Sequence, residues 1–112
     1  MPLVYIILIN YNGYKDTIEC INSLKKINYN NYKIIIIDNA SSDDSCKILR
    51  QKTEDYILLE SKENLGFAGG NNLGIKYALE HNTDYIMLLN NDTVVETNFL
   101  DNMVVSFNKD NS

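Results

Sequence analysis

The sequence predicts an α/β fold: an open, mostly parallel sheet with flanking helices, formed by a single domain over residues 1–112. Continuous apolar runs rich in β-branched residues indicate strands buried on both faces, as in parallel sheets covered by helices. Segments with helical periodicity alternate with these runs, which gives the order β-α-β-α-β-α-β-α. A length of 112 residues with 45% hydrophobic residues suits one core and excludes two.

Three strong strands and one weaker strand are expected. The first covers Leu3–Ile9, a run of apolar residues followed directly by polar ones. Ile34–Ile37 and Tyr85–Leu89 are two further continuous runs, and Tyr56–Leu59 is the weaker strand. Because β-α-β crossovers in one sheet are right-handed, the helices between these strands should cover the faces of the sheet.

Four helices are expected in the segments that follow the strands. The first comes after Asn12-Gly13, and the second begins in Ser41–Asp44, which has the composition of an N-cap and an acidic first turn. The third covers Asn71–Glu80. The fourth, Leu100–Phe107, has an amphipathic pattern, and its apolar side needs a covering surface.

A stripe of small residues lies on one side of the third helix. Gly70, Gly74 and Ala78 are four residues apart and therefore share a face. Such a face allows close approach to a sheet or to a ligand, and close packing on the sheet accounts for it well.

Composition excludes several classes of function. The net charge of −5 argues against a nucleic-acid partner, which requires basic residues to neutralise phosphates. No apolar run approaches the roughly 20 residues of a membrane span, and the first run lacks the basic leader of a signal peptide. Cys20 and Cys46 form no Cys-x-x-Cys motif and are expected as buried free thiols, with a disulfide or redox pair as the alternative. A cytoplasmic setting follows, with a peripheral position at the inner face of the membrane as a further option.

Polar residues follow the predicted strands at the points where ligands bind in open α/β sheets. Each cluster alone is ordinary turn chemistry, because Asn, Asp and Gly are the common turn residues. Their occurrence after successive strands predicts a binding site at the carboxyl edge of the sheet. The clusters are Asn10–Gly13, Asp38–Asn39, Asn64–Asn72 and Asn90–Asp92.

The residue types in these clusters favour a nucleoside diphosphate. The sequence has neither a Gly-x-Gly-x-x-Gly turn nor a P-loop, and it lacks the acidic pair of a phosphate receiver after the first strand. Asp92 closes an apolar strand and could hold a divalent cation that also takes diphosphate oxygens. Asp38 could accept hydrogen bonds from a base or ribose, and Tyr11 offers a ring for stacking.

Four segments in this order resemble the family 2 glycosyltransferases, which have the GT-A fold, a Rossmann-like nucleotide-diphospho-sugar transferase fold. The resemblance is to their N-terminal, donor-binding portion, and the third and fourth segments look most like the rhamnosyltransferase-like branch. The chain would then be a truncated domain without the acceptor-binding part. The segments are Val4–Asn12, Ile35–Asp43, Asn64–Gly74 and Leu88–Thr93.

The resemblance implies roles for single residues. Asp38 should contact the base, Tyr11 should flank it, and Asp92 should bind Mg²⁺ or Mn²⁺ as the acid of an Asp-x-Asp motif. Asn90 replaces the first acid of that motif, so metal binding without donor should be weak. The full nucleotide-binding set is Asn10, Tyr11, Asp38, Asn64, Gly66, Gly69, Asn72, Asn90 and Asn91.

The family also implies a reaction, an inverting transfer of a sugar from a dTDP- or UDP-linked donor to a glycan or lipid-linked acceptor. Polysaccharide or cell-surface glycan synthesis is the expected setting. The general base is expected beyond Ser112, so no catalytic residue is assigned and the chain alone is expected to be inactive. The alternative is a non-catalytic module that keeps the fold and self-associates as a homo-oligomer. A related sugar-nucleotide pyrophosphorylase is disfavoured, because Asn12–Lys15 is a poor match to its Gly-rich phosphate loop.

Overall fold

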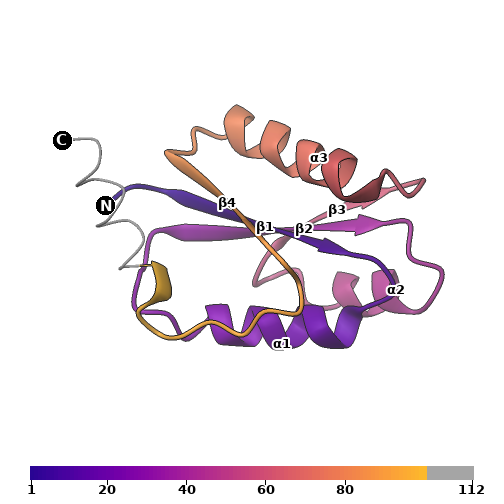
Figure 1. Cartoon of the computed structure of the whole chain (residues 1–112), viewed down its shortest axis with the longest axis horizontal. Helices are drawn as coiled ribbons and strands as arrows, with labels where there is room; N and C mark the ends of the chain where they lie inside the picture. Colours follow the sequence, from indigo (N-terminus) through magenta and orange to yellow (C-terminus); the bar gives the residue numbers. More distant parts are fainter. Residues whose placement is uncertain (101–112) are drawn as a thin grey trace.

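A computed structural model describes residues 1–100 and has a four-stranded sheet in the order β3-β2-β1-β4 (Figure 1). All neighbouring strands are parallel. The open parallel α/β fold and its four predicted strands are therefore confirmed. The strands are β1 (Val4–Asn10), β2 (Tyr32–Asn39), β3 (Ile57–Ser61) and β4 (Tyr85–Leu89), and the helices are α1 (Tyr14–Leu24), α2 (Ser45–Arg50) and α3 (Gly66–Glu80).

The helices form a layer on each face of the sheet (Figure 1). Alternate residues of β1 point to opposite faces, as the pleat of a strand requires. Val4, Ile6 and Leu8 pack with side chains of α1 and α2, whereas Tyr5 and Ile7 pack with Ala78 of α3. Because both faces are covered, the central strands have no polar side and appear in the sequence as continuous apolar runs.

The strand order places a topological switch point between β1 and β4. The chain moves outward from β1 through β2 to β3 and then crosses back over the other face to β4. Right-handed crossovers in opposite directions place α3 on the face opposite α1 and α2. Ligands of open α/β sheets bind outside the carboxyl ends of the strands at such a point.

The small residues of α3 contact β1 directly. A Cβ atom added at Gly74 would lie 2.7 Å from Ile7 Cγ2, and one added at Gly70 would lie 2.9 Å from Ile9 Cδ1. Both positions therefore leave room only for hydrogen. The stripe is explained by close packing of α3 on the sheet, and not by a ligand.

Two predicted helix starts are wrong. The third helix begins at Gly66 and not at Asn71, so most of the segment 64–72 that was expected to be a loop is helical. Its packing on β1 outweighs the poor helix propensity of glycine. The second helix begins at Ser45 and not within Ser41–Asp44, because residues 41–43 are held by side chains at the ends of β1 and β2.

The segment after β4 returns along α1 toward the start of the chain (Figure 1). The backbone N–H of Val95 donates to Ser23 Oγ at 3.2 Å, and that of Asn28 donates to Thr97 O at 2.7 Å. Leu100 is 1% exposed within the core of the single chain. The other apolar residues of the predicted fourth helix lie outside the described residues, and self-association stays a prediction. Within residues 1–100, none of the helices is both long and apolar enough for a membrane crossing.

Candidate functional site

The carboxyl ends of the strands gather the predicted polar residues. Asn10 ends β1 and is paired in register with Asp38 of β2, and Asn90–Asp92 follow β4 directly. The polar clusters therefore meet at one edge of the sheet, as predicted.

A cavity of about 480 Å³ opens at this edge beside the switch point. Its walls come from the ends of β1, β2 and β4, the loop after β4 and the first residues of α3. We call it the strand-end cavity. It is lined by Ile9, Tyr11, Asn39, Asn64, Gly66, Phe67, Leu89, Asn90, Asn91 and Asp92.

The side chain of Asn39, at the end of β2, forms hydrogen bonds with the backbone at the start of α3. Its Nδ2 donates to Gly66 O at 2.9 Å, and its Oδ1 accepts from the Leu65 N–H at 2.9 Å. Gly66 has a φ of +72°, a left-handed conformation that a side chain would strain. Asn64 Oδ1 also accepts from the Gly66 N–H at 2.9 Å. These bonds fix the wall of the strand-end cavity that contains Phe67.

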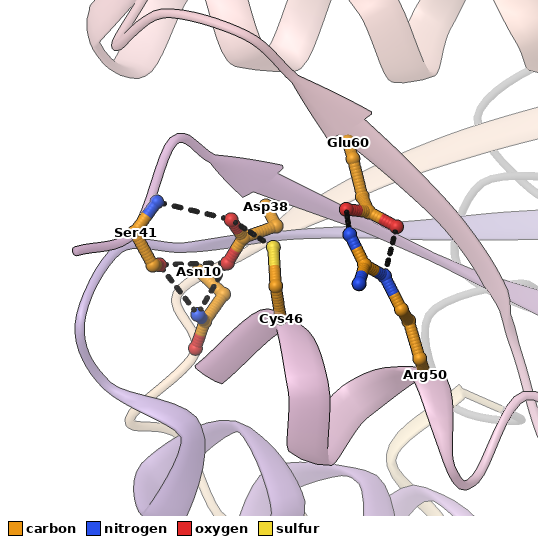
Figure 2. A network of polar contacts seen from close by, with 6 residues as sticks. All are labelled: Asn10, Asp38, Ser41, Cys46, Arg50 and Glu60. Atoms are coloured by element: carbon orange, nitrogen blue, oxygen red, sulfur yellow. Dashed lines mark hydrogen bonds and ion pairs between the residues drawn. The ribbon is translucent and has the colours of Figure 1, made fainter. Parts of the chain in front are cut away.

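Asp38 lies below this edge, fully buried, and accepts four hydrogen bonds (Figure 2). Asn10 Nδ2 and Ser41 Oγ donate to Oδ1 at 2.9 and 2.7 Å. The Ser41 backbone N–H and Cys46 Sγ donate to Oδ2 at 3.0 and 2.8 Å. Burial raises the pKa of Asp38, but the hydrogen bonds from Cys46, Ser41 and Asn10 outweigh burial and hold that pKa below its ordinary value. The group is therefore a buried carboxylate anion.

An ion pair lies beside this carboxylate. Arg50 of α2 donates Nε to Oε2 of Glu60 at 2.8 Å and Nη2 to its other oxygen (Figure 2). Glu60 stands opposite Asp38 in the register of β3 with β2. The hydrogen bond from Arg50 lowers the pKa of Glu60. The pair is largely exposed, so it contributes little to stability.

A chain of hydrogen bonds extends from Asp38 to the loop after β4. Thr17 Oγ1 of α1 donates to Asn10 Oδ1 at 2.6 Å and accepts from Asn91 Nδ2 at 3.0 Å. Asn10, Thr17 and Asp38 are each 0% exposed. The buried carboxylate is thus connected through two side chains to a residue that lines the strand-end cavity.

The turn after β2 is also held by Asn12, in the segment that follows β1. Asn12 Oδ1 accepts from the backbone N–H groups of Ser42 and Asp43 at 2.7 and 3.2 Å. Ala40 has a φ of 62°, which costs a residue with a Cβ atom about 1–2 kcal/mol. This strained turn directs the Ser41 N–H back to the carboxylate of Asp38.

The two thiols are free, as predicted, but Cys46 is only half-buried. Cys20 is buried, and burial together with the charge of Asp92 raises its pKa to about 11. Burial and the neighbouring carboxylate of Asp38 raise the pKa of Cys46 to about 12. Both groups are protonated at neutral pH and are poor nucleophiles, so Cys46 acts as a hydrogen-bond donor.

Asp92 is the acid of the strand-end cavity, and it is exposed. Within residues 1–100 no three His, Cys, Asp or Glu side chains come together as a metal site. One carboxylate with neighbouring amide oxygens suits Mg²⁺, which commonly binds one or two carboxylates together with substrate phosphates. The residues present therefore fit a cation that a phosphorylated ligand helps to hold.

The structure brings most of the predicted residues together. Six of them line the strand-end cavity: Tyr11, Asn64, Gly66, Asn90, Asn91 and Asp92. Asn10 and Asp38 are buried beneath it. Gly69 and Asn72 lie in the helix and do not line it, and Gly69 faces Leu65, whose Cβ an added Cβ would meet at 2.7 Å.

Phe67 and Asn39 lie inside predicted segments, but the sequence assigns neither of them a role in the site. Phe67 lines the strand-end cavity and is 60% exposed, so its ring is available to a ligand there. Asn39 both lines the cavity and orders α3. Asn39 lies in the segment Ile35–Asp43 and Phe67 in Asn64–Gly74, and these positions are what could have identified them from the sequence.

The lowered pKa of Asp38 leads to a prediction about acid. A carboxyl whose folded-state pKa is lowered stabilises the protein above its unfolded pKa, and this stability is lost as pH falls through the folded value. We expect the melting temperature of the wild type to fall more steeply below about pH 4 than that of Asp38→Asn, measured by circular dichroism. Parallel slopes for wild type and Asp38→Asn would contradict the assignment.

The sequence matches a protein family and is similar to a curated bacterial enzyme. It matches the family described as "Glycosyl transferase family 2" over residues 5–112. It is 35% identical over 98 residues to poly-beta-1,6-N-acetyl-D-glucosamine synthase of Staphylococcus aureus, an alignment that covers 85% of this chain and 23% of the relative. The chain therefore spans about a quarter of the length of this curated relative.

Solved structures share the fold. TarS 1–349 of S. aureus in complex with UDP-GlcNAc superposes with a TM-score of 0.78 at 20% identity, over 96% of this chain and 31% of that one. Mannosyltransferase PcManGT of Pyrobaculum calidifontis in complex with GDP-Man and Mn²⁺ gives a TM-score of 0.76 at 22% identity, over 92% and 31% of the two chains. Both likenesses establish the GT-A architecture of this chain.

Proposed function

The chain belongs to glycosyl transferase family 2, and from this premise we propose that its strand-end cavity binds the nucleoside diphosphate of a sugar donor. In this proposal residues 1–112 are the donor-binding part of an enzyme that transfers the sugar to an acceptor hydroxyl. The observation that carries the proposal is the convergence of Tyr11, Asn90 and Asp92 on one cavity at the switch point of the sheet.

The base is assigned to the aromatic side of the cavity. Tyr11 is 49% exposed and Phe67 is 60% exposed, so each offers a ring face that a base can cover. Asn64 and Gly66 stand at the beginning of α3, where the positive end of the helix dipole favours an anion. We therefore assign the ribose and diphosphate to the side of the cavity that Asn64 and Gly66 form.

Asp38 keeps its proposed role as an acceptor for the base. Its four acceptor positions are filled, so a base N–H must replace a donor. The Ser41 hydroxyl can rotate away, whereas the Ser41 backbone N–H is fixed by the turn. Asn10 positions the carboxylate, while Gly69 and Asn72 complete the proposed set through the shape of α3.

The divalent cation is assigned to Asp92 with amide oxygens of its neighbours Asn90 and Asn91. Mg²⁺ or Mn²⁺ bound there would offset the charge of the leaving diphosphate. Mn²⁺ is present in the mannosyltransferase structure named above. With one carboxylate in the cavity, the diphosphate must supply further ligands, so the cation should bind weakly without the donor.

The proposed reaction is an inverting transfer. The acceptor hydroxyl attacks the anomeric carbon, its proton passes to a general base, and the nucleoside diphosphate leaves. We assign that base and the acceptor surface to sequence beyond Ser112, so residues 1–112 alone should bind the donor without transferring sugar. A UDP- or dTDP-linked donor and a role in polysaccharide or cell-surface glycan synthesis are proposed, since relatives include a polysaccharide synthase. The resemblance of residues 64–74 and 88–93 favours the rhamnosyltransferase-like branch.

Isothermal titration of the full chain with UDP, dTDP and GDP, with and without Mn²⁺, tests the proposal. We expect UDP or dTDP to bind more tightly than GDP, and Mn²⁺ to strengthen that binding. Absence of binding for all three nucleotides in the presence of Mn²⁺ would overturn the proposal.

Replacing Tyr11 with alanine is expected to weaken UDP binding. Loss of a stacking ring costs about 1–3 kcal/mol, which corresponds to roughly 5- to 150-fold in affinity. Tyr11→Phe keeps the ring and should bind as the wild type does. Phe67→Ala provides the comparison for the second aromatic wall. If both alanine variants bind UDP with unchanged affinity, the base does not bind at the aromatic side of the cavity.

A further inference from the structure

The hydrogen-bonded chain from Asp38 to Asn91 has a fixed direction. An ionised carboxylate accepts hydrogen bonds and cannot donate them. Asn10 must therefore present its NH₂ group to Asp38, in agreement with the 2.9 Å contact of Nδ2 with Oδ1. This orientation turns the Asn10 oxygen toward Thr17, which must then donate its hydroxyl proton. The buried carboxylate of Asp38 therefore decides which group donates in each of these hydrogen bonds.

The direction is transmitted further by the hydroxyl of Thr17. A hydroxyl carries one proton, and that of Thr17 is used toward Asn10 at 2.6 Å. Toward Asn91 the same oxygen can only accept, so Asn91 must turn its NH₂ group inward, in agreement with the 3.0 Å contact. The amide oxygen of Asn91 is then the atom left for the strand-end cavity that this residue lines.

We propose that Asp38, acting through Asn10 and Thr17, orients the side chain of Asn91 so that its amide oxygen faces the cavity as a ligand for a divalent cation beside Asp92. This inference rests on the proposed function. Thr17 is a positioning residue, because it lies fully buried on α1 and does not line the cavity. A reversed amide would present an NH₂ group, which cannot bind a cation.

The orientation of the Asn91 amide matters because the cavity offers a cation few oxygen ligands. The cavity holds one carboxylate, Asp92, so each additional oxygen contributes a large share of the protein's ligands. Groups that orient metal ligands from outside typically change metal affinity by about 10- to 100-fold. The three buried side chains therefore compensate in part for Asn90, which stands where the family's motif has its first acid.

A double-mutant cycle on stability tests the fixed direction without any ligand. Asn91→Asp places an acceptor against a hydroxyl that already donates to Asn10, so we expect a clear drop in melting temperature. Asp38→Asn allows the whole chain to reverse and so accommodates Asn91→Asp. The double variant should therefore unfold at a higher temperature than Asn91→Asp alone. If the losses in melting temperature of the two single variants simply add in the double variant, the inference is overturned, because distant independent sites are additive.

The same cycle in the Thr17→Val background removes the alternative of plain charge repulsion. Valine has nearly the shape of threonine but cannot relay a hydrogen bond. The coupling between positions 38 and 91 should disappear there, whereas repulsion between two carboxylates would persist. Coupling of unchanged size in the Thr17→Val background would contradict a relay through the hydroxyl.

A binding measurement covers the case in which Asn91→Asp fails to fold. Thr17→Val should lose about 10-fold or more of the Mn²⁺-dependent gain in UDP affinity, while Thr17→Ser should keep it. UDP affinity without Mn²⁺ should be the same in both variants. Equal Mn²⁺ gains in Thr17→Val and Thr17→Ser would overturn the inference. A wild type that binds no nucleotide would instead overturn the proposed function, and the stability cycle would still decide the direction of the chain.

Discussion

Replacing Asp38 with alanine is expected to lower the free energy of unfolding by roughly 3–5 kcal/mol, because one buried donor and three half-buried donors lose their acceptor together. The donors are the Asn10 amide, the Ser41 hydroxyl and N–H, and the Cys46 thiol. Each buried donor left unpaired costs about 1–3 kcal/mol, and domains of this size have only about 5–15 kcal/mol in total. Urea unfolding of the full chain followed by circular dichroism measures the loss.

Two variants separate this effect from the removal of a charge in general. Asp38→Asn keeps an oxygen for the Ser41 N–H and the thiol, so its loss should be distinctly smaller than that of alanine. Glu54→Ala removes an exposed carboxyl from the turn after α2 and should change stability by less than about 0.5 kcal/mol. A stability of Asp38→Ala close to the wild type would show that this carboxylate does not organise the turn after β2.

The sheet could be predicted from sequence because its pattern has a direct physical cause. β1 and the apolar part of β2 are covered by helices on both faces, so no residue of Ile34–Ile37 meets water and the run is apolar throughout. Polar residues begin where each strand leaves this cover. The positions of the site clusters follow from the same boundary, which is why they could be placed before their contacts were known.

The start of α3 could not be predicted in this way. Glycine is a poor helix former, so Gly66–Gly70 was taken for a loop. The helix depends on contacts far away in sequence: Asn39 holds its first turn, and Gly70 packs on Ile9. No local pattern contains these contacts.

The surroundings of Asp38 were hidden for a similar reason. The sequence identifies a carboxylate at the end of a strand, but not that Cys46 and Ser41 fill its acceptor positions. Cys46 was interpreted as a buried thiol with no further role. Its hydrogen bond to Asp38 arises because α2, which begins at Ser45, lies against the end of β2.

Asp92→Asn is expected to abolish most sugar transfer by the full-length protein, with a loss in kcat on the order of 1,000-fold. A bound cation supplies several kcal/mol of stabilisation to the developing charge of the leaving diphosphate, and each 1.4 kcal/mol is tenfold in rate. Asp92 is the carboxylate of the strand-end cavity, so no neighbouring acid there can replace it. Release of UDP or dTDP from the corresponding donor, measured across Mn²⁺ concentrations, reports the loss.

Asn90→Asp provides the opposite change at the same site. It adds a second carboxylate two residues from Asp92 and should let Mn²⁺ bind without nucleotide, whereas the wild type should bind Mn²⁺ weakly until UDP is present. Asp92→Asn in this background should keep part of the Mn²⁺ affinity but not the wild-type rate. Full activity of Asp92→Asn with Mn²⁺ chelated would mean that charge on the leaving group is offset by other residues, and the cation would lose its place in the proposed reaction.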